Sequence, residues 1–198
     1  MYFGLSEEQQ SLEDNIKKYL EDNASLDTIK EVASGDTAKS ADIHKGLLEL
    51  GVSGLMVPEQ YGGLELDMLF ASVVSGALGS GTAPVPYAGA YVMAPIALTL
   101  AGSDTQKENW LPKIAGGEAV IGIGLSEYVG AREDAAITAS GKTISGRCLF
   151  VIDAKEADAY ILANKAGELY LVDAKAKGIS VTDLVTVDKT RPSIELNL

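Results

Sequence analysis

The sequence predicts an α+β fold, in which an all-α helical domain covers residues 1–118 and an antiparallel β-barrel or sandwich covers residues 119–198. In the first part, apolar side chains recur at helical spacing behind two capping boxes, which begin at Ser6 and Ser103. From Ala119 onward, short runs rich in β-branched and aromatic residues alternate with glycine-containing turns. The spacing of apolar residues changes once along the chain, from a helical to a strand-like period, so we expect one domain boundary, near residue 118.

Glycine, proline and capping residues divide the first domain into separate expected helices. The stretch 88–101 carries no charged residue, which indicates a helix buried on most sides, and Pro95 is expected to kink or begin it. The loop VPEQYGG, residues 57–63, is the clearest break between helices. One helix is expected directly after Ser6 and another directly after Ser103. The helices between them are expected at residues 26–33, 41–50, 67–78 and 88–101.

The second domain is expected to contain about six strands of an incomplete β-barrel. The runs are AVIGIGL, TISGRCLFVI, DAYILAN, ELYLVDA, GISVTDL and SIELNL. The last run reaches the end of the sequence at Leu198, and a barrel lacks edges only when it is closed. We therefore expect an open sheet edge, as in a truncated chain or in one whose partner covers the edge.

Composition narrows the possible partners and the cellular compartment. The net charge of −12 disfavours nucleic acid, because duplex binding relies on clustered lysine and arginine. The single cysteine, Cys148, excludes an internal disulfide, and the sequence has no cysteine–histidine cluster for a metal. The first residues lack the features of a signal peptide, and no apolar run reaches the roughly 18 residues of a membrane-spanning helix. We expect a cytoplasmic protein that does not span the membrane.

Two residues could serve a flavin or nucleotide site, which needs a hydroxyl near the ring and a flat apolar wall. Ser126 ends an apolar strand and offers the hydroxyl, and Phe150 offers a wall on a neighbouring strand. In the alternative interpretation, Ser126 binds nearby backbone and Phe150 belongs to the core. The residues alone favour this alternative.

Other polar residues have simpler structural interpretations. Glu127 and Asp158 are candidates for general acid–base chemistry, but such residues more often cap turns or pair with lysine and arginine. His44 is expected to be a surface or partly buried helical residue, and Cys148 a small packed side chain.

Several stretches together resemble the acyl-CoA dehydrogenase family of flavoproteins. PEQYGG resembles the family's Pro-Glu-x-Tyr-Gly-Gly loop, and LPKIAGGE, residues 111–118, resembles the step before its central strand. ISGRCLFVIDAKEADAYILAN is similar to a strand pair of the middle domain, and DKTRPSIEL resembles an element near that domain's end. The order and spacing of these stretches, which cover nearly the whole chain, carry the resemblance.

The resemblance implies a fold of three parts: a helical domain, a middle β-barrel and a C-terminal four-helix bundle. Only the first two are present in these 198 residues. Family members bind FAD and acyl-CoA between barrel and bundle, and oxidise the thioester to the 2-enoyl-CoA, as in fatty acid β-oxidation. Their partners are an electron-transfer flavoprotein and further subunits of the oligomer. The family's catalytic glutamate lies in the bundle, so the isolated chain is expected to be inactive.

The resemblance also assigns roles to individual residues. The family's threonine–glutamate pair beside the flavin falls on Ser126 and Glu127, and its aromatic flavin wall falls on Phe150. The family's contacts of backbone and side chain with ring or substrate fall on Ile123 and Leu125.

Two departures from the family pattern bear on binding. A hydroxyl residue that often contacts the flavin is replaced by Ile152, whose backbone N–H is the remaining contact. A serine near the acyl-CoA is replaced by Arg132. These departures leave two hypotheses: part of a working FAD-dependent acyl-CoA dehydrogenase, or a non-catalytic scaffold or partner subunit of a heteromeric one.

Overall fold

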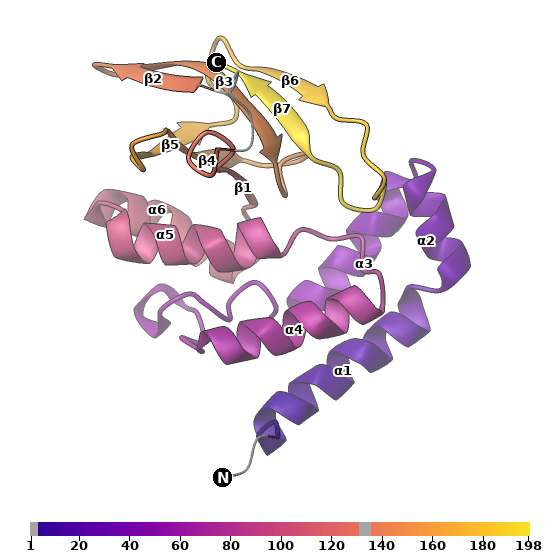
Figure 1. The fold of residues 1–198 in the computed structure, drawn as a ribbon. Coiled ribbons are helices and arrows are strands. Elements are labelled where there is room, and N and C mark those ends of the chain that lie inside the picture. The colour runs from indigo at the N-terminus through magenta and orange to yellow at the C-terminus, as the bar shows by residue number, and fades with distance from the viewer. Residues whose placement is uncertain (1–3, 131–135) are drawn as a thin grey trace. The chain divides into compact units, whose positions relative to one another are not determined.

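A computed structural model describes residues 4–130 and 136–198 of the chain (Figure 1). The chain divides after Glu118 into two compact units. We call residues up to Glu118 the helical unit and residues from Ala119 onward the β unit. Among the described residues, no helix is long and apolar enough to cross a membrane.

Both predicted capping boxes are confirmed. The Ser6 side chain accepts from the Gln9 backbone N–H at 3.2 Å, and the Gln9 side chain accepts from the Ser6 N–H at 2.9 Å. The same reciprocal pair joins Ser103 and Gln106. These caps begin α1 (Glu7–Asn23) and α6 (Asp104–Ala115), because each pairs backbone donors that the first helical turn leaves free.

The intermediate helices follow the predicted order, and the capping residues fix their first turns. The Asp36 side chain accepts from the Lys39 N–H, so the third helix begins at Thr37 and not at Ala41. The Asp67 side chain accepts from two N–H groups in the same way and begins the fourth helix. These elements are α2 (Leu26–Ala33), α3 (Thr37–Glu49), η1 (Glu59–Tyr61) and α4 (Met68–Ser80).

The uncharged stretch 88–101 forms two kinds of helix. A π-helix, η2 (Ala88–Met93), leads directly into α5 (Ala94–Ala101). Pro95 stands in the first turn of α5, at the junction with η2, so it begins a helix as predicted. Tyr87 precedes η2 and donates its buried hydroxyl to the Ala71 carbonyl on α4 at 2.9 Å. Burial raises the pKa of Tyr87, so this donor stays protonated.

The helical unit contains one histidine, and it is paired with a buried tyrosine. His44 Nε2 on α3 lies 2.8 Å from the Tyr91 hydroxyl on η2, and the two rings stack with centroids 5.8 Å apart. Tyr91 is only 1% exposed, and burial lowers the pKa of His44 below 6.5. The sequence prediction of a partly buried helical histidine is correct, but its partner lies on another helix.

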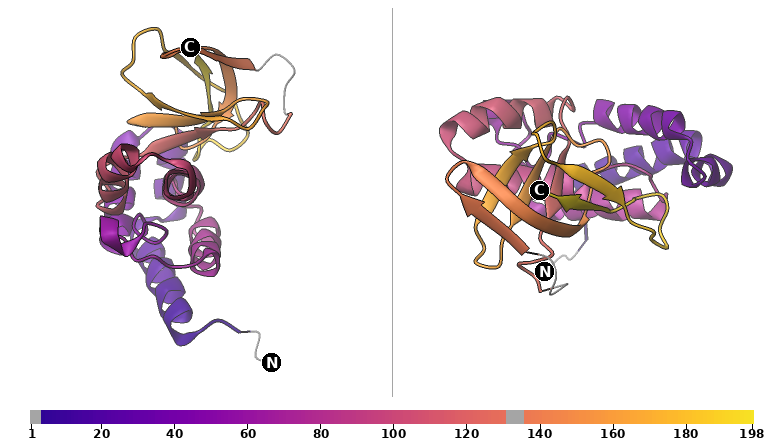
Figure 2. Two further views of the ribbon diagram at one scale, coloured as in Figure 1. Left: turned by 90° about the vertical axis from the view of Figure 1, so that its left-hand side faces the viewer. Right: turned by 90° about the horizontal axis from the view of Figure 1, so that it is seen from above.

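The β unit contains seven strands among its described residues, arranged in two sheets. One sheet has the order β1-β4-β5, and the other has the order β2-β3-β7-β6 (Figures 1 and 2). The strands are β1 (Ile121–Gly124), β2 (Ala136–Ser140), β3 (Thr143–Val151), β4 (Ala159–Ala163), β5 (Leu169–Asp173), β6 (Ser180–Asp183) and β7 (Ile194–Asn197).

The structure corrects the predicted antiparallel β architecture in one respect. β1 pairs with β4 in parallel, with Ile121 opposite Ala159, whereas every other ladder is antiparallel. The two strands are not sequence neighbours, because the β2–β3 hairpin separates them, and no tight turn forces them to run oppositely. The two sheets form an open sandwich, which is one of the two predicted architectures.

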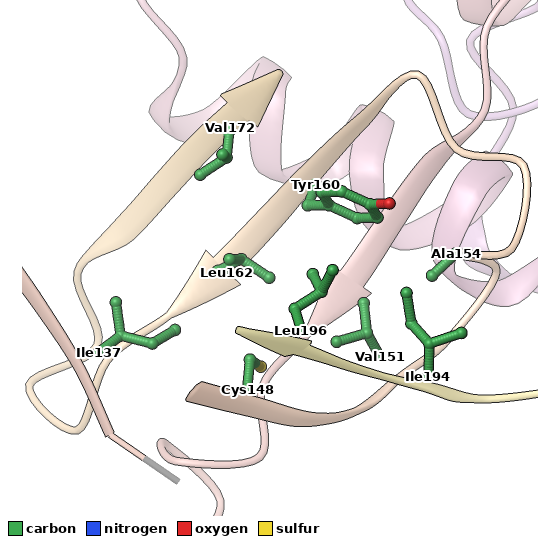
Figure 3. Close-up of a cluster of buried hydrophobic side chains, with 9 residues drawn as sticks. All are labelled: Ile137, Cys148, Val151, Ala154, Tyr160, Leu162, Val172, Ile194 and Leu196. Carbon is green, nitrogen blue, oxygen red and sulfur yellow. The ribbon is translucent and has the colours of Figure 1, made fainter. Parts of the chain in front are cut away.

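The core of the β unit lies between its two sheets, where side chains of β3, β4 and β7 converge (Figure 3). Gly122 and Gly124 of β1 lack side chains, so residues of the core pack directly against the β1 backbone. A Cβ atom added at Gly124 would lie 2.5 Å from Cys148 Sγ and 2.8 Å from Leu162 Cδ2, so no larger residue fits without displacement. The buried cluster comprises Ile137, Cys148, Val151, Ala154, Tyr160, Leu162, Val172, Ile194 and Leu196.

We expect acid to destabilise the helical unit through His44. The unfolded chain binds the proton more readily than the folded one, so stability is retained above pH 6.5 and is lost as the pH falls below it. His44→Gln keeps an amide that can bond the Tyr91 hydroxyl but does not titrate. Urea unfolding between about pH 5 and 7, above the carboxylate range, measures the difference. Equal pH slopes for the wild type and His44→Gln would contradict this account.

Two glycine-to-alanine substitutions should have opposite effects on stability. Gly124→Ala forces a methyl group into Cys148 and Leu162 and should cost about 1–3 kcal/mol. Gly76→Ala on α4 meets nothing within 4 Å and should gain about 1 kcal/mol from helix propensity alone. Chemical denaturation of both variants measures the pair. A neutral Gly124→Ala would mean that β1 does not pack as closely as described.

Candidate functional site

The candidate site lies where β1 ends against the end of β3, and we call this region the β1 corner. It comprises Ile123, the turn Leu125–Gly130 and the segment Leu149–Asp153. Ile123 and Ile152 exchange both main-chain hydrogen bonds, each at 3.0 Å. This bridge joins β1, which already pairs with β4, to the strand of the other sheet. The resulting backbone frame holds Ser126 and Phe150 in place.

Ser126 points into the protein. Its residue is only 4% exposed, and its Oγ accepts from the Leu149 backbone N–H at 3.0 Å. The same Oγ lies 3.5 Å from Cys148 Sγ. The alternative interpretation, in which the Ser126 hydroxyl binds nearby backbone, is therefore correct for the oxygen as an acceptor. One hydroxyl proton remains, and its direction decides whether Ser126 can also serve a ligand.

Glu127 shapes the turn that follows β1. Its Oε2 accepts from the Ile137 backbone N–H at the start of β2 at 2.7 Å. Within the turn, the Val129 N–H donates to the Leu125 carbonyl at 3.0 Å, and the Gly130 N–H donates to the Glu127 carbonyl at 3.1 Å. The carboxylate thus has a structural partner, which supports the structural interpretation over general acid–base chemistry.

Phe150 faces outward, so its assignment to the core is wrong. The β3–β7 register shifts between Cys148 and Val151, which marks a β-bulge. Phe150 takes a φ of 53° and is 45% exposed, whereas Leu149 and Val151 on either side are buried. A left-handed conformation costs a non-glycine residue about 1–3 kcal/mol, and such strain is frequent at functional sites. The bulge presents a flat aromatic face at the β1 corner.

The remaining candidate residues have varied positions. Asp158 Oδ2 accepts from the Val120 N–H at 3.0 Å, so it ties the start of β4 to the start of β1 and is a structural residue. Cys148 is fully buried, as predicted. Arg132, the expected acyl-CoA contact, lies outside the described residues. Among the residues that the structure does describe, no cluster of side chains could hold a metal ion.

Tyr128, which directly follows the Ser126–Glu127 pair, was not among the site residues predicted from the sequence. Its side chain is 58% exposed and rests on Gly167 of the β4–β5 hairpin, where an added Cβ would come within 3.1 Å of the ring. Asn164 stiffens that hairpin by accepting from the Ala166 and Glu168 N–H groups, both at 3.0 Å. An aromatic residue in an otherwise polar turn could have marked Tyr128 in the sequence as a residue with a tertiary contact.

The β1 corner offers a flavin one aromatic ring and one hydroxyl group. Phe150 supplies an exposed aromatic ring, and Ser126 supplies one buried hydroxyl, whose oxygen accepts from the Leu149 N–H. The main-chain groups of Ile123 and Ile152 bond each other, and the Ile152 side chain offers no donor. The assigned flavin contacts of Ile123, Leu125, Ser126, Phe150 and Ile152 stay predictions.

The "Acyl-CoA dehydrogenase, N-terminal domain" family matches residues 6–118, which is more than half of the chain. The chain belongs to the acyl-CoA dehydrogenase family. A probable acyl-CoA dehydrogenase of Bacillus subtilis (strain 168) is 23% identical over 188 residues, which is 88% of this chain and 32% of that protein. The chain spans about a third of the length of the curated relatives it matches.

Solved structures share the fold of this chain. In the ChsE4-ChsE5 complex from Mycobacterium tuberculosis, the match has a TM-score of 0.86 at 24% identity and covers 100% of this chain and 55% of that chain. An acyl-CoA dehydrogenase complexed with FAD from Bacillus anthracis matches with a TM-score of 0.79 at 22% identity, over 98% of this chain and 36% of that one. The expected α+β architecture is therefore confirmed.

The strain at Phe150 predicts a reversed order of glycine and alanine variants. Phe150→Gly should be more stable than Phe150→Ala by about 1 kcal/mol, because only glycine adopts this φ without cost. At Thr182, on the exposed strand β6, the glycine variant should be the less stable one. Thermal unfolding of the four variants compares the two sites. The same order at both positions would show that Phe150 is unstrained.

Proposed function

We propose that this protein contributes the helical and β parts of an FAD-dependent acyl-CoA dehydrogenase, which introduces an α,β double bond into an acyl-CoA thioester. Membership of the family, together with a strained and exposed Phe150 beside a buried Ser126, supports the proposal. When bound, FAD supplies the hydride acceptor for the oxidation of the carbon–carbon bond.

Five residues of the β1 corner have a defined part in this proposal. Phe150 stacks against the isoalloxazine ring, and Ser126 donates its hydroxyl proton to the edge of the ring. Leu125 and Ile152, which are half-buried, add apolar surface to this wall, and the buried Ile123 supports it through its main-chain bridge to Ile152. Arg132 is proposed to contact the acyl-CoA.

The whole site needs more than these residues. The chain spans about a third of its curated relatives, and the resemblance places the proton-abstracting glutamate in the C-terminal bundle. A pocket without that wall neither excludes water nor positions a base, so the 198 residues alone should not oxidise a thioester. The proposed partners are acyl-CoA, an electron-transfer flavoprotein and further acyl-CoA dehydrogenase subunits, in the cytoplasm.

A non-catalytic partner subunit is the second candidate. The observation in its favour is Ile152, which offers no hydroxyl and whose N–H already donates to Ile123. Such a chain would complete a heteromeric acyl-CoA dehydrogenase without holding flavin of its own. The two candidates differ in a single measurable property, the stoichiometry of FAD per chain.

FAD retention after desalting separates the two candidates. The chain and the complete gene product are each incubated with excess FAD, desalted and examined by visible absorption. The enzyme proposal predicts one FAD per chain in the complete protein, and Phe150→Ala should weaken binding roughly tenfold through lost stacking. Val187→Ala is the matched control, because it removes a fully exposed apolar side chain from the β unit. A complete protein that retains no flavin would refute the enzyme proposal and favour the partner subunit.

A further inference from the structure

The single cysteine lies directly behind the proposed flavin contact. Cys148 is 0% exposed, and its Sγ is 3.5 Å from Ser126 Oγ. Gly124 makes room for the sulfur, because a Cβ at that position would come within 2.5 Å of it. The thiol is therefore held between the β1 backbone and the Ser126 hydroxyl.

The hydrogen-bonding capacity of Ser126 is limited to one proton and two lone pairs. The Leu149 N–H occupies one lone pair. If Cys148 donates its S–H, it fills the second lone pair and leaves the hydroxyl proton for a ligand. If the sulfur accepts instead, the hydroxyl proton is used inside the protein and Ser126 has nothing left to donate.

The surroundings of the thiol favour the first arrangement. Burial raises the pKa of Cys148, so the sulfur keeps its proton, although the neighbouring Ser126 groups act in the opposite direction. Val151 and Leu196, which belong to the same buried cluster, are apolar and accept no hydrogen bond. A hydroxyl oxygen is also a better acceptor than a thiol sulfur, which is weak in both roles.

We propose that Cys148 is a positioning residue, which donates its S–H to Ser126 Oγ and thereby directs the Ser126 hydroxyl proton toward the bound cofactor. The destination of that proton rests on the proposed function. The direction of the S–H···O bond does not, and it can be measured in the protein without flavin.

Infrared spectroscopy tests the bond directly, because the S–H stretching band of this chain has a single source. The band should be shifted to lower frequency in the native protein relative to the protein unfolded in urea. Ser126→Ala should move it back toward the unfolded position, with native circular dichroism as the control for folding. A native band at the unfolded position, or an unmoved band in folded Ser126→Ala, would overturn the proposal. If Ser126→Ala does not fold, Ser126→Thr replaces it, and its retained hydroxyl should keep the shift.

FAD affinity tests the consequence for the ligand. Cys148→Ala removes the S–H donor, so nothing fixes the direction of the Ser126 hydroxyl proton, and FAD binding should weaken roughly three- to tenfold. Cys148→Ser restores a donor at the same place and should recover the affinity. Wild-type affinity in Cys148→Ala would refute the positioning role while leaving the proposed function intact. Failure of the complete wild-type protein to bind FAD would refute the proposed function, and the infrared result would still decide the bond.

Discussion

The close packing of β1, which joins the β1-β4-β5 sheet to the end of β3, is the constraint on which the β unit depends. β1 pairs in parallel with β4 along one side and bridges to Ile152 through Ile123 on the other. Gly122 and Gly124 permit this, since an added Cβ at Gly122 would come within 2.9 Å of Ala154 and one at Gly124 within 2.5 Å of Cys148. A four-residue strand thus determines where the bulge of β3 and the following turn lie.

This fit divides the β1 corner into an apolar outer face and a polar interior. The bulge turns Phe150 outward with a strained backbone, and the turn after β1 carries Ser126 inward to the Leu149 N–H. Glu127 then fastens the turn to β2 through Ile137. Strain, exposure and buried hydrogen bonding therefore meet within a few residues, as expected where a protein holds a ligand against a rigid frame.

The family match and the candidate flavin site lie in different units of the chain. The family match covers residues 6–118, whereas the residues that would face a flavin belong to the β unit. The helical unit is stabilised by helix caps such as Ser6 and Ser103 and by buried apolar side chains. Two residues of the β unit affect the donors that a flavin would meet. Ile152 offers none, because its N–H donates to the Ile123 carbonyl, and Cys148 is proposed to donate its S–H to Ser126.

The sequence by itself determined what depends on neighbours along the chain. The capped helices, Pro95 at the start of α5, the change of period and the candidacy of Ser126 and Phe150 all rest on local patterns. Tertiary structure decided the parallel β1–β4 pair, the outward Phe150, and the partners of Ser126, Glu127 and His44. Each of these contacts joins residues distant in sequence, and neither composition nor periodicity encodes which distant strand or helix a side chain will meet.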